Sequence, residues 1–218
     1  GAPGADRRNH RQDREARLLR STGRGRHQAP TQAAVLGLTR GLAVDLGANG
    51  IRVNSVLPGL VDMHAHPALR GSRYGVDPDV EFLPRGVTTV MSQGDAGALN
   101  WNDYQREVVQ GRRTRVVMAL SLSKYGESQE ERCFVALDDA DVDACATTVS
   151  ETEADIWGIA FNTGLPTIGD LDPKDIMKRG LAAAEACGRP ILYGARWEED
   201  WPLAQQLELL RAGDVVTY

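Results

Sequence analysis

From residue 59 to the end of the chain, short apolar patterns typical of strands alternate with amphipathic helical patterns. Such alternation makes right-handed βαβ units. A Gly or Pro just before a short apolar run is typical of a strand that is buried in a parallel sheet. The sequence therefore predicts an α/β fold with a parallel sheet. Its six expected strands cover residues 59–66, 86–93, 115–123, 155–162, 190–196 and 214–218, separated by helices near 77–85, 100–111, 139–154, 172–188 and 201–213.

The number of strands limits the kind of barrel that these units can form. A closed eightfold (β/α) barrel takes about 250 residues, whereas the alternation here stops after six strands. We therefore predict an incomplete (β/α) TIM-type barrel over residues 57–218 and a chain that is a fragment of such a barrel. Open strand edges expose unpaired backbone groups, so the sequence also predicts self-association through them.

The segment before the barrel has a different character. Residues 1–27 hold eight arginines against three acidic residues, a local charge of +5, so the remainder of the chain carries −10. Because residues 1–30 have few apolar side chains, we expect a disordered or misassembled Arg-rich leader there, followed by one helix-strand unit over residues 31–56. An arginine-rich nucleic-acid arm is the alternative, but the aromatics that stack on bases are missing. We predict no nucleic-acid partner.

Composition also indicates the cellular compartment of the chain and whether it has a membrane partner. Apolar residues make up 42% of the sequence, but no apolar run approaches the roughly 20 residues that cross a bilayer, and the N-terminus has no apolar signal core. We therefore predict no membrane partner. The three cysteines are odd in number and lack CxxC spacing, which favours reduced thiols in a cytoplasmic protein.

The strand pattern "GLVDMHAH" carries the clearest candidate site. Side chains on a strand alternate between its two faces, so Asp62, His64 and His66 are expected to share one face. Two converging imidazoles suit zinc or another divalent metal, and Asp62 would orient one ring. The alternative is a pair of histidines that bind no metal.

The motifs "LPGLVDMHAHP" and "RGVTTVMSQGDAG" resemble the amidohydrolase superfamily, in particular its dihydroorotase-like, D-aminoacylase and deacetylase branches. This resemblance covers residues 57–218. It implies a distorted TIM barrel in which divalent metals activate water for attack on an amide or cyclic amide of a small-molecule substrate. It also implies that His64 and His66 are metal ligands.

Other residues of that family's site are replaced here. Its bridging lysine should fall in "GIAFNTG", which offers Asn162, and its fifth-strand histidine should fall in "PILYGAR", which offers Gly194 and Arg196. Asn162, Glu198 or Lys124 are conceivable substitute ligands, because barrel sites collect residues from strand ends. No catalytic residue is assigned, and an inactive, non-catalytic α/β domain is an alternative.

The stretch "AAVLGLTRGLAVDLGANGIRVNSVLPGLVD" resembles the C-terminal part of a short-chain dehydrogenase/reductase over residues 27–62. The positions of that family's catalytic tyrosine and lysine hold Gln28 and Gln32, and its glycine-rich phosphate loop is missing, so no nucleotide-binding residue is assigned. An NAD(P)-dependent reductase is thus a second functional alternative. We expect a chimera whose join lies within residues 56–62.

Overall fold

The structure, a computed structural model, describes residues 38, 41, 42, 44, 45, 59–70, 72, 74–128, 132–152 and 154–217. The chain divides into two compact units, residues 1–57 and 58–218. In the first unit the few described residues are helical and exposed. The predicted leader over 1–30 and the predicted strand before residue 56 lie outside the described residues.

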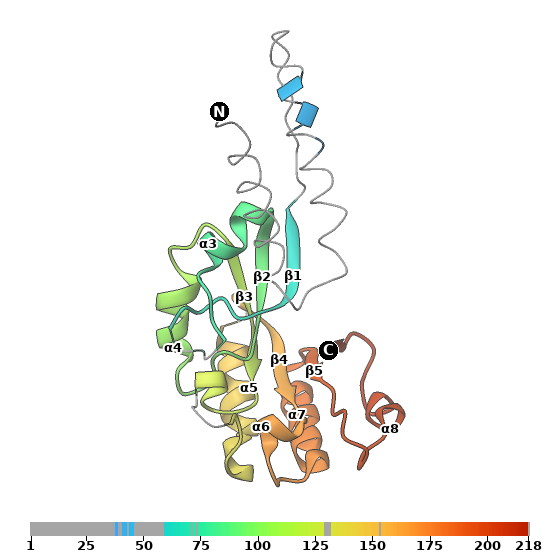
Figure 1. The fold of residues 1–218 in the computed structure, drawn as a ribbon. Helices are drawn as coiled ribbons and strands as arrows, with labels where there is room; N and C mark the ends of the chain where they lie inside the picture. Colours follow the sequence, from blue (N-terminus) through green and yellow to red (C-terminus); the bar gives the residue numbers. More distant parts are fainter. Residues whose placement is uncertain are drawn as a thin grey trace, which may run out of the picture. The chain divides into compact units, whose positions relative to one another are not determined.

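The second unit contains a sheet of six parallel strands joined through helices (Figure 1). Neighbours along the chain are also neighbours in the sheet, in the order β1 to β6, and every pair is parallel. These strands form a nearly closed barrel, which confirms the predicted fold class. They are β1 (Leu60–Ala65), β2 (Val87–Gln93), β3 (Arg115–Ser121), β4 (Ile156–Asn162), β5 (Ile191–Gly194) and β6 (Val215–Thr217).

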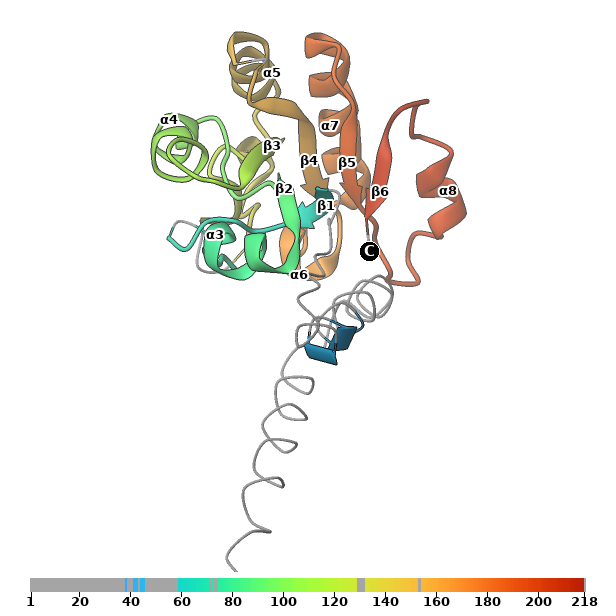
Figure 2. The same ribbon diagram turned by 90° about the horizontal axis from the view of Figure 1, so that it is seen from above.

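Helices surround the strands when this unit is seen from above (Figure 2). Each helix predicted between the strands of this unit is present, although most are shorter than the sequence pattern indicated. Within the described part of the chain, no helix is long and apolar enough to cross a membrane. The helical elements are α3 (Pro78–Glu81), η1 (Leu83–Arg85), α4 (Trp101–Tyr104), the π-helical η2 (Gln105–Val109), η3 (Gly126–Ser128), η4 (Leu137–Asp139), α5 (Val142–Glu151), α6 (Leu165–Ile168), α7 (Pro173–Cys187) and α8 (Leu203–Leu207).

Helix α7 shows how local sequence fixes an element against the sheet. Asp172 caps its N-terminus by accepting a hydrogen bond from a backbone N–H, Pro173 occupies the first turn, and Gly188 ends the helix in the left-handed conformation. Gly180 faces the sheet, and a Cβ built there would lie only 2.1 Å from the Phe161 ring. Glycine at this position therefore lets the helix approach β4 closely.

The strands bury side chains on both faces, as a barrel requires. The larger apolar cluster lies between the strands and the helices and includes Met118, Leu120, Ile159 and Ile191. A smaller cluster is formed by the alternate strand positions, with Met91, Ala119, Ala160 and Leu192. Because side chains alternate along each strand, the second cluster faces the barrel interior.

The chain after β5 is held by the buried side chain of Gln206 on α8. Its Oε1 accepts hydrogen bonds from the Tyr193 hydroxyl at 2.6 Å and from the Arg196 N–H at 2.9 Å. Its Nε2 donates to the carbonyls of Arg196 and Trp201 at 2.9 and 2.7 Å. Because buried polar groups are costly to leave unpaired, these four bonds fix α8 to the end of β5.

We predict that Gln206→Leu destabilises the fold strongly. The substitution nearly preserves volume but removes one of the two partners of the Tyr193 hydroxyl and the partners of nearby backbone groups, so the free energy of unfolding should fall by about 3 kcal/mol. Gln205→Leu is the matched control, because Gln205 is exposed on the same helix, and it should change stability by less than about 0.5 kcal/mol. Urea unfolding followed by tryptophan fluorescence measures both. Equal midpoints for the two variants would contradict the prediction.

Candidate functional site

His66 follows β1 and is held by a carboxylate that the sequence analysis missed. Its Nδ1 lies 2.6 Å from Oδ1 of Asp95, which follows β2 and is completely buried. Ser92 Oγ and the Tyr104 hydroxyl donate to the other carboxylate oxygen at 2.8 and 3.1 Å. When Nδ1 donates to Asp95, the Nε2 of a neutral ring carries the lone pair for a metal or a proton.

His64 lies beside His66, with ring centroids 5.6 Å apart in an edge-to-face arrangement. Its Nδ1 is 2.6 Å from Oγ1 of Thr217 on β6, so this contact joins the first strand of the barrel to the last. The structure therefore brings the two predicted metal ligands together. The contact between His64 and Thr217 lies between the edges of β1 and β6, which the sequence analysis predicted to be open.

Asp62 has a different role from the one predicted for it. The pairing of β1 with β2 shifts by one residue between Asp62 and Ala65, and the Asp62 carboxylate accepts a hydrogen bond from the His64 backbone N–H at 3.0 Å there. A bulge of this kind re-aims the side chains that follow it. Asp62 thus stabilises the bulge, while Asp95 is the carboxylate that binds an imidazole.

The two imidazoles differ in basicity. Burial lowers the pKa of His64, and the charge of nearby His66 lowers it further. Burial alone would also lower the pKa of His66, but the hydrogen bond and charge of Asp95, with the charge of Glu127, raise it above its usual value. His64 is therefore the readier neutral ligand, and His66 is the readier proton acceptor.

We predict that Asp95→Asn lowers the pKa of His66, because burial remains while the carboxylate charge is lost. In the wild type, the raised pKa means that this pair stabilises the fold fully below the unfolded pKa of about 6.5 and loses that contribution as pH rises through the folded pKa. NMR titration of the histidine rings measures the change. Asp62→Asn is the control and should leave the His66 titration unchanged; an unaltered titration in Asp95→Asn would refute the assigned hydrogen bond.

His64 and His66 supply only part of the ligand set that a divalent metal requires. Imidazole nitrogens suit zinc, and His64 and His66 supply two of them, whereas a catalytic zinc usually has three protein ligands. Among the residues that the structure describes, no group of three or more His, Cys, Asp or Glu side chains is placed to hold one ion. The described His, Cys, Asp and Glu side chains therefore do not supply a third ligand.

Asn162 and Gly194 occupy the positions where the resemblance would place a lysine and a histidine, and the two residues fit one another sterically. Asn162 at the end of β4 is the pairing partner of Gly194 at the end of β5. A Cβ built on Gly194 would lie 2.7 Å from Cγ of Asn162, so glycine there leaves room for the amide. The Asn162 Oδ1 accepts a hydrogen bond from the Gly164 N–H at 2.6 Å, which fixes the amide's orientation.

The other conceivable substitute ligands have structural partners. Lys124 Nζ pairs with Asp139 at 3.2 Å, and Glu198 Oε1 accepts a hydrogen bond from the Leu165 N–H at 2.9 Å. The buried guanidinium of Arg196 forms a bidentate pair with Asp200 and donates to a backbone carbonyl after β4. These side chains fix the loops after the strands, which is a structural role.

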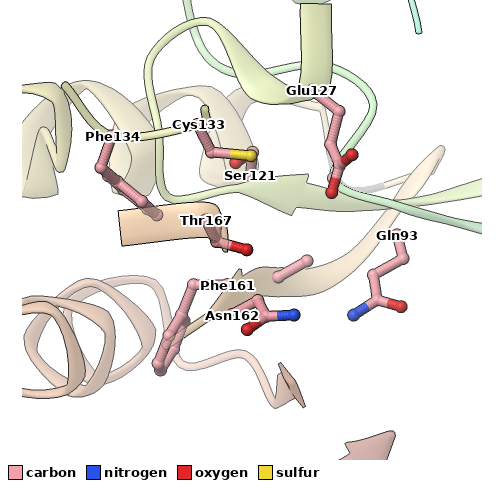
Figure 3. A pocket seen from close by; sticks show the side chains of 10 residues that line it. Gln93, Ser121, Glu127, Cys133, Phe134, Phe161, Asn162 and Thr167 are labelled. Carbon is pink, nitrogen blue, oxygen red and sulfur yellow. The ribbon is translucent and has the colours of Figure 1, made fainter. Parts of the chain in front are cut away.

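A pocket opens at the carboxyl ends of β2, β3 and β4, where barrel proteins place their sites (Figure 3). Gln93 and Gly94 immediately precede Asp95, whose carboxylate contacts His66, so the pocket lies near His66. The sequence analysis missed this pocket, although its position after successive strands was a usable signal. It is lined by Gln93, Gly94, Ser121, Glu127, Cys133, Phe134, Ala160, Phe161, Asn162 and Thr167.

Two curated bacterial proteins are similar to this chain. It is 26% identical to a deacetylase from Agrobacterium fabrum over 206 residues, covering 90% of this chain and 50% of that protein. It is also 26% identical to a deacetylase from Brucella anthropi over 165 residues, covering 75% of this chain and 40% of that protein. The chain thus spans half or less of the length of these relatives.

Solved structures share the barrel. A dihydroorotase matches with a TM-score of 0.67 and 25% identity, over 73% of this chain and 44% of that chain. An adenine deaminase shares the fold with a TM-score of 0.65 and 23% identity, over 72% of this chain and 42% of that chain. The fold defines a (β/α)-barrel protein with candidate site residues at the strand ends. Together with the curated deacetylases, the structures point to the amidohydrolase superfamily, as the motifs around His64 and His66 predicted.

The segment before the barrel has its own match. Residues 19–91 match a family described as enoyl-(acyl carrier protein) reductase, which supports the predicted reductase resemblance. This match continues through β1 and most of β2, beyond the join predicted within residues 56–62. The alignment with the A. fabrum deacetylase covers more of the chain than the barrel alone. The two resemblances therefore overlap, and the position of the join stays a prediction.

Proposed function

We propose that this chain is a metal-dependent amidohydrolase that cleaves a C–N bond of an amide or cyclic amide in a small-molecule substrate. The observation that carries the proposal is the pair of adjacent imidazoles, one of them oriented by a buried carboxylate, beside a polar pocket at the barrel mouth. His64 and His66 would hold zinc or another divalent metal, which supplies a nucleophilic water near neutral pH and polarises a carbonyl.

The residues around His66 prepare it for this role. Asp95 keeps a proton on Nδ1 and so directs the lone pair of Nε2 away from the buried carboxylate. Ser92 and Tyr104 hold Asp95 in place by donating to its second oxygen. A buried carboxylate costs stability unless its oxygens are hydrogen-bonded. The partners of Asp95 remove this cost, which supports a role for Asp95 in orienting the His66 ring.

We predict that the purified full chain binds zinc and that His64→Ala loses it. Metal analysis after dialysis should give about one equivalent for the wild type, and Asp95→Asn should weaken the affinity by about 10- to 100-fold because the ring is less well oriented. His27→Ala is the control, because His27 is not one of the proposed ligands. Less than a tenth of an equivalent in the wild type would reject the metal site and favour a non-catalytic α/β domain.

A reductase function is the second candidate, and the family match over residues 19–91 is the observation in its favour. We predict that titration with the chain leaves the fluorescence of NADPH unchanged. The reason is that Gln28 and Gln32, at the catalytic positions of that family, provide neither its proton donor nor its cation. These glutamines lie outside the described residues. A saturable change in fluorescence would overturn this expectation.

Several sequence predictions are part of this proposal. We propose a cytoplasmic protein that has no nucleic-acid or membrane partner and that self-associates through the edges of β1 and β6. We also propose that the chain joins a reductase-like segment to the amidohydrolase-like barrel and is a fragment with reduced or no activity. Sequencing of the encoding DNA on both sides of the chain would test whether it is a fragment.

A further inference from the structure

Thr217 brings a hydroxyl group from β6 to the barrel mouth. Strand β6 pairs in parallel with β5, and Thr217 lies opposite Gly194 in that pairing. Val215 packs against the apolar cluster inside the barrel, and side chains alternate along a strand, so the Thr217 side chain also faces the interior. The pairing with β5 therefore fixes where this hydroxyl lies.

The Thr217 hydroxyl has a histidine on one side and no side chain on the other. Its pairing partner Gly194 has none, whereas Nδ1 of His64 lies 2.6 Å from Oγ1 of Thr217. Among the described residues, this imidazole is the one hydrogen-bond partner of the hydroxyl. The two residues are 153 positions apart in the sequence, so the bond requires that β6 is docked on β5.

The bond gives His64 the same arrangement as its neighbour. Nδ1 of His66 is 2.6 Å from the Asp95 carboxylate, so a side-chain oxygen holds Nδ1 in both rings. The hydrogen bond at one ring nitrogen decides which nitrogen carries the proton. When Nδ1–H donates to oxygen, the lone pair stays on Nε2, which is the usual arrangement of a metal-bound imidazole.

The carboxylates near His64 are bonded elsewhere. Asp62 accepts a hydrogen bond from the His64 backbone N–H at 3.0 Å, and Asp95 is shared by His66, Ser92 and Tyr104. The neutral hydroxyl of β6 thus takes for the His64 ring the place that a carboxylate takes for the neighbouring ring.

We infer that Thr217 is a positioning residue for His64: its hydroxyl accepts a hydrogen bond from Nδ1–H and keeps the lone pair on Nε2, the atom that would bind a metal. The inference rests on the proposed function, because it names the residue that prepares one of the two proposed ligands. It makes the ligand pair near β1 depend on the pairing of β6 with β5, which the spacing of the two histidines does not indicate.

The tautomer of the His64 ring in the zinc-free full chain tests the inference. Long-range 1H–15N spectra in EDTA at about pH 8, where an imidazole is neutral, distinguish Nδ1–H from Nε2–H. We expect Nδ1–H in the wild type and in Thr217→Ser, which keeps the hydroxyl. Thr217→Val keeps the shape without the hydroxyl and should shift His64 to Nε2–H, the form that free histidine prefers in water. His64→Ala assigns the resonances.

Zinc affinity, measured by competition with a fluorescent chelator, is a second readout. Thr217→Val should bind zinc about tenfold more weakly than the wild type, and Thr217→Ser should stay within about twofold, because loss of a partner that orients a ligand weakens metal binding. Thr89→Val is the matched control. It makes the same change at a half-buried threonine of β2 and should alter neither the zinc affinity nor the His64 tautomer.

Urea unfolding of the same variants separates positioning from stability. If Thr217 were merely structural, Thr217→Val would lower the unfolding midpoint but leave the tautomer and the zinc affinity of the folded protein as in the wild type. That result would overturn the inference.

Nε2–H on His64 in the wild type would overturn it as well, and this measurement decides the matter even if Thr217→Val does not fold. Because the tautomer is measured without zinc, Nδ1–H in the wild type and Nε2–H in Thr217→Val would support the role of Thr217 even if metal analysis rejects the proposed hydrolase. The wrong tautomer would leave the zinc prediction for His64→Ala intact.

Discussion

Parallel pairing of all six strands is the constraint on which the site depends. It brings the carboxyl ends of successive strands to one mouth of the barrel, so His66 after β1 meets Asp95 after β2, and Gln93 faces Asn162 across the pocket. These residues are far apart in the sequence. A sheet with antiparallel neighbours would place alternate strand ends at opposite edges and separate them.

The cost of burying polar groups explains which of these side chains are structural and which are available for binding. Gln206 and Arg196 have their hydrogen-bonding groups satisfied by the chain itself, so they fix the segments around β5 and α8. Asp95 is also fully bonded, but one of its partners is an imidazole whose second nitrogen is directed elsewhere. Gln93 alone among these leaves a buried oxygen unpaired, at the pocket.

The ends of β4 and β5 differ from what the resemblance to the amidohydrolase superfamily implies. At the ends of β4 and β5, Asn162 and Gly194 replace the lysine and histidine that the resemblance implies, and the absence of a side chain on Gly194 is what makes room for the Asn162 amide. The two replacements fit one another sterically.

The strand–helix alternation and the spacing of His64 and His66 were enough to predict the fold class, the order of elements and the candidate ligand pair, because side-chain periodicity along strands and helices is local. Asp62 could not be placed correctly, since a one-residue bulge in β1 depends on pairing with β2. Asp95, Tyr104 and the contact between His64 and Thr217 required the folded barrel for the same reason. The sequence by itself determined which residues lie at strand ends; the tertiary structure decided which of those ends meet, because curvature and register bring distant segments together.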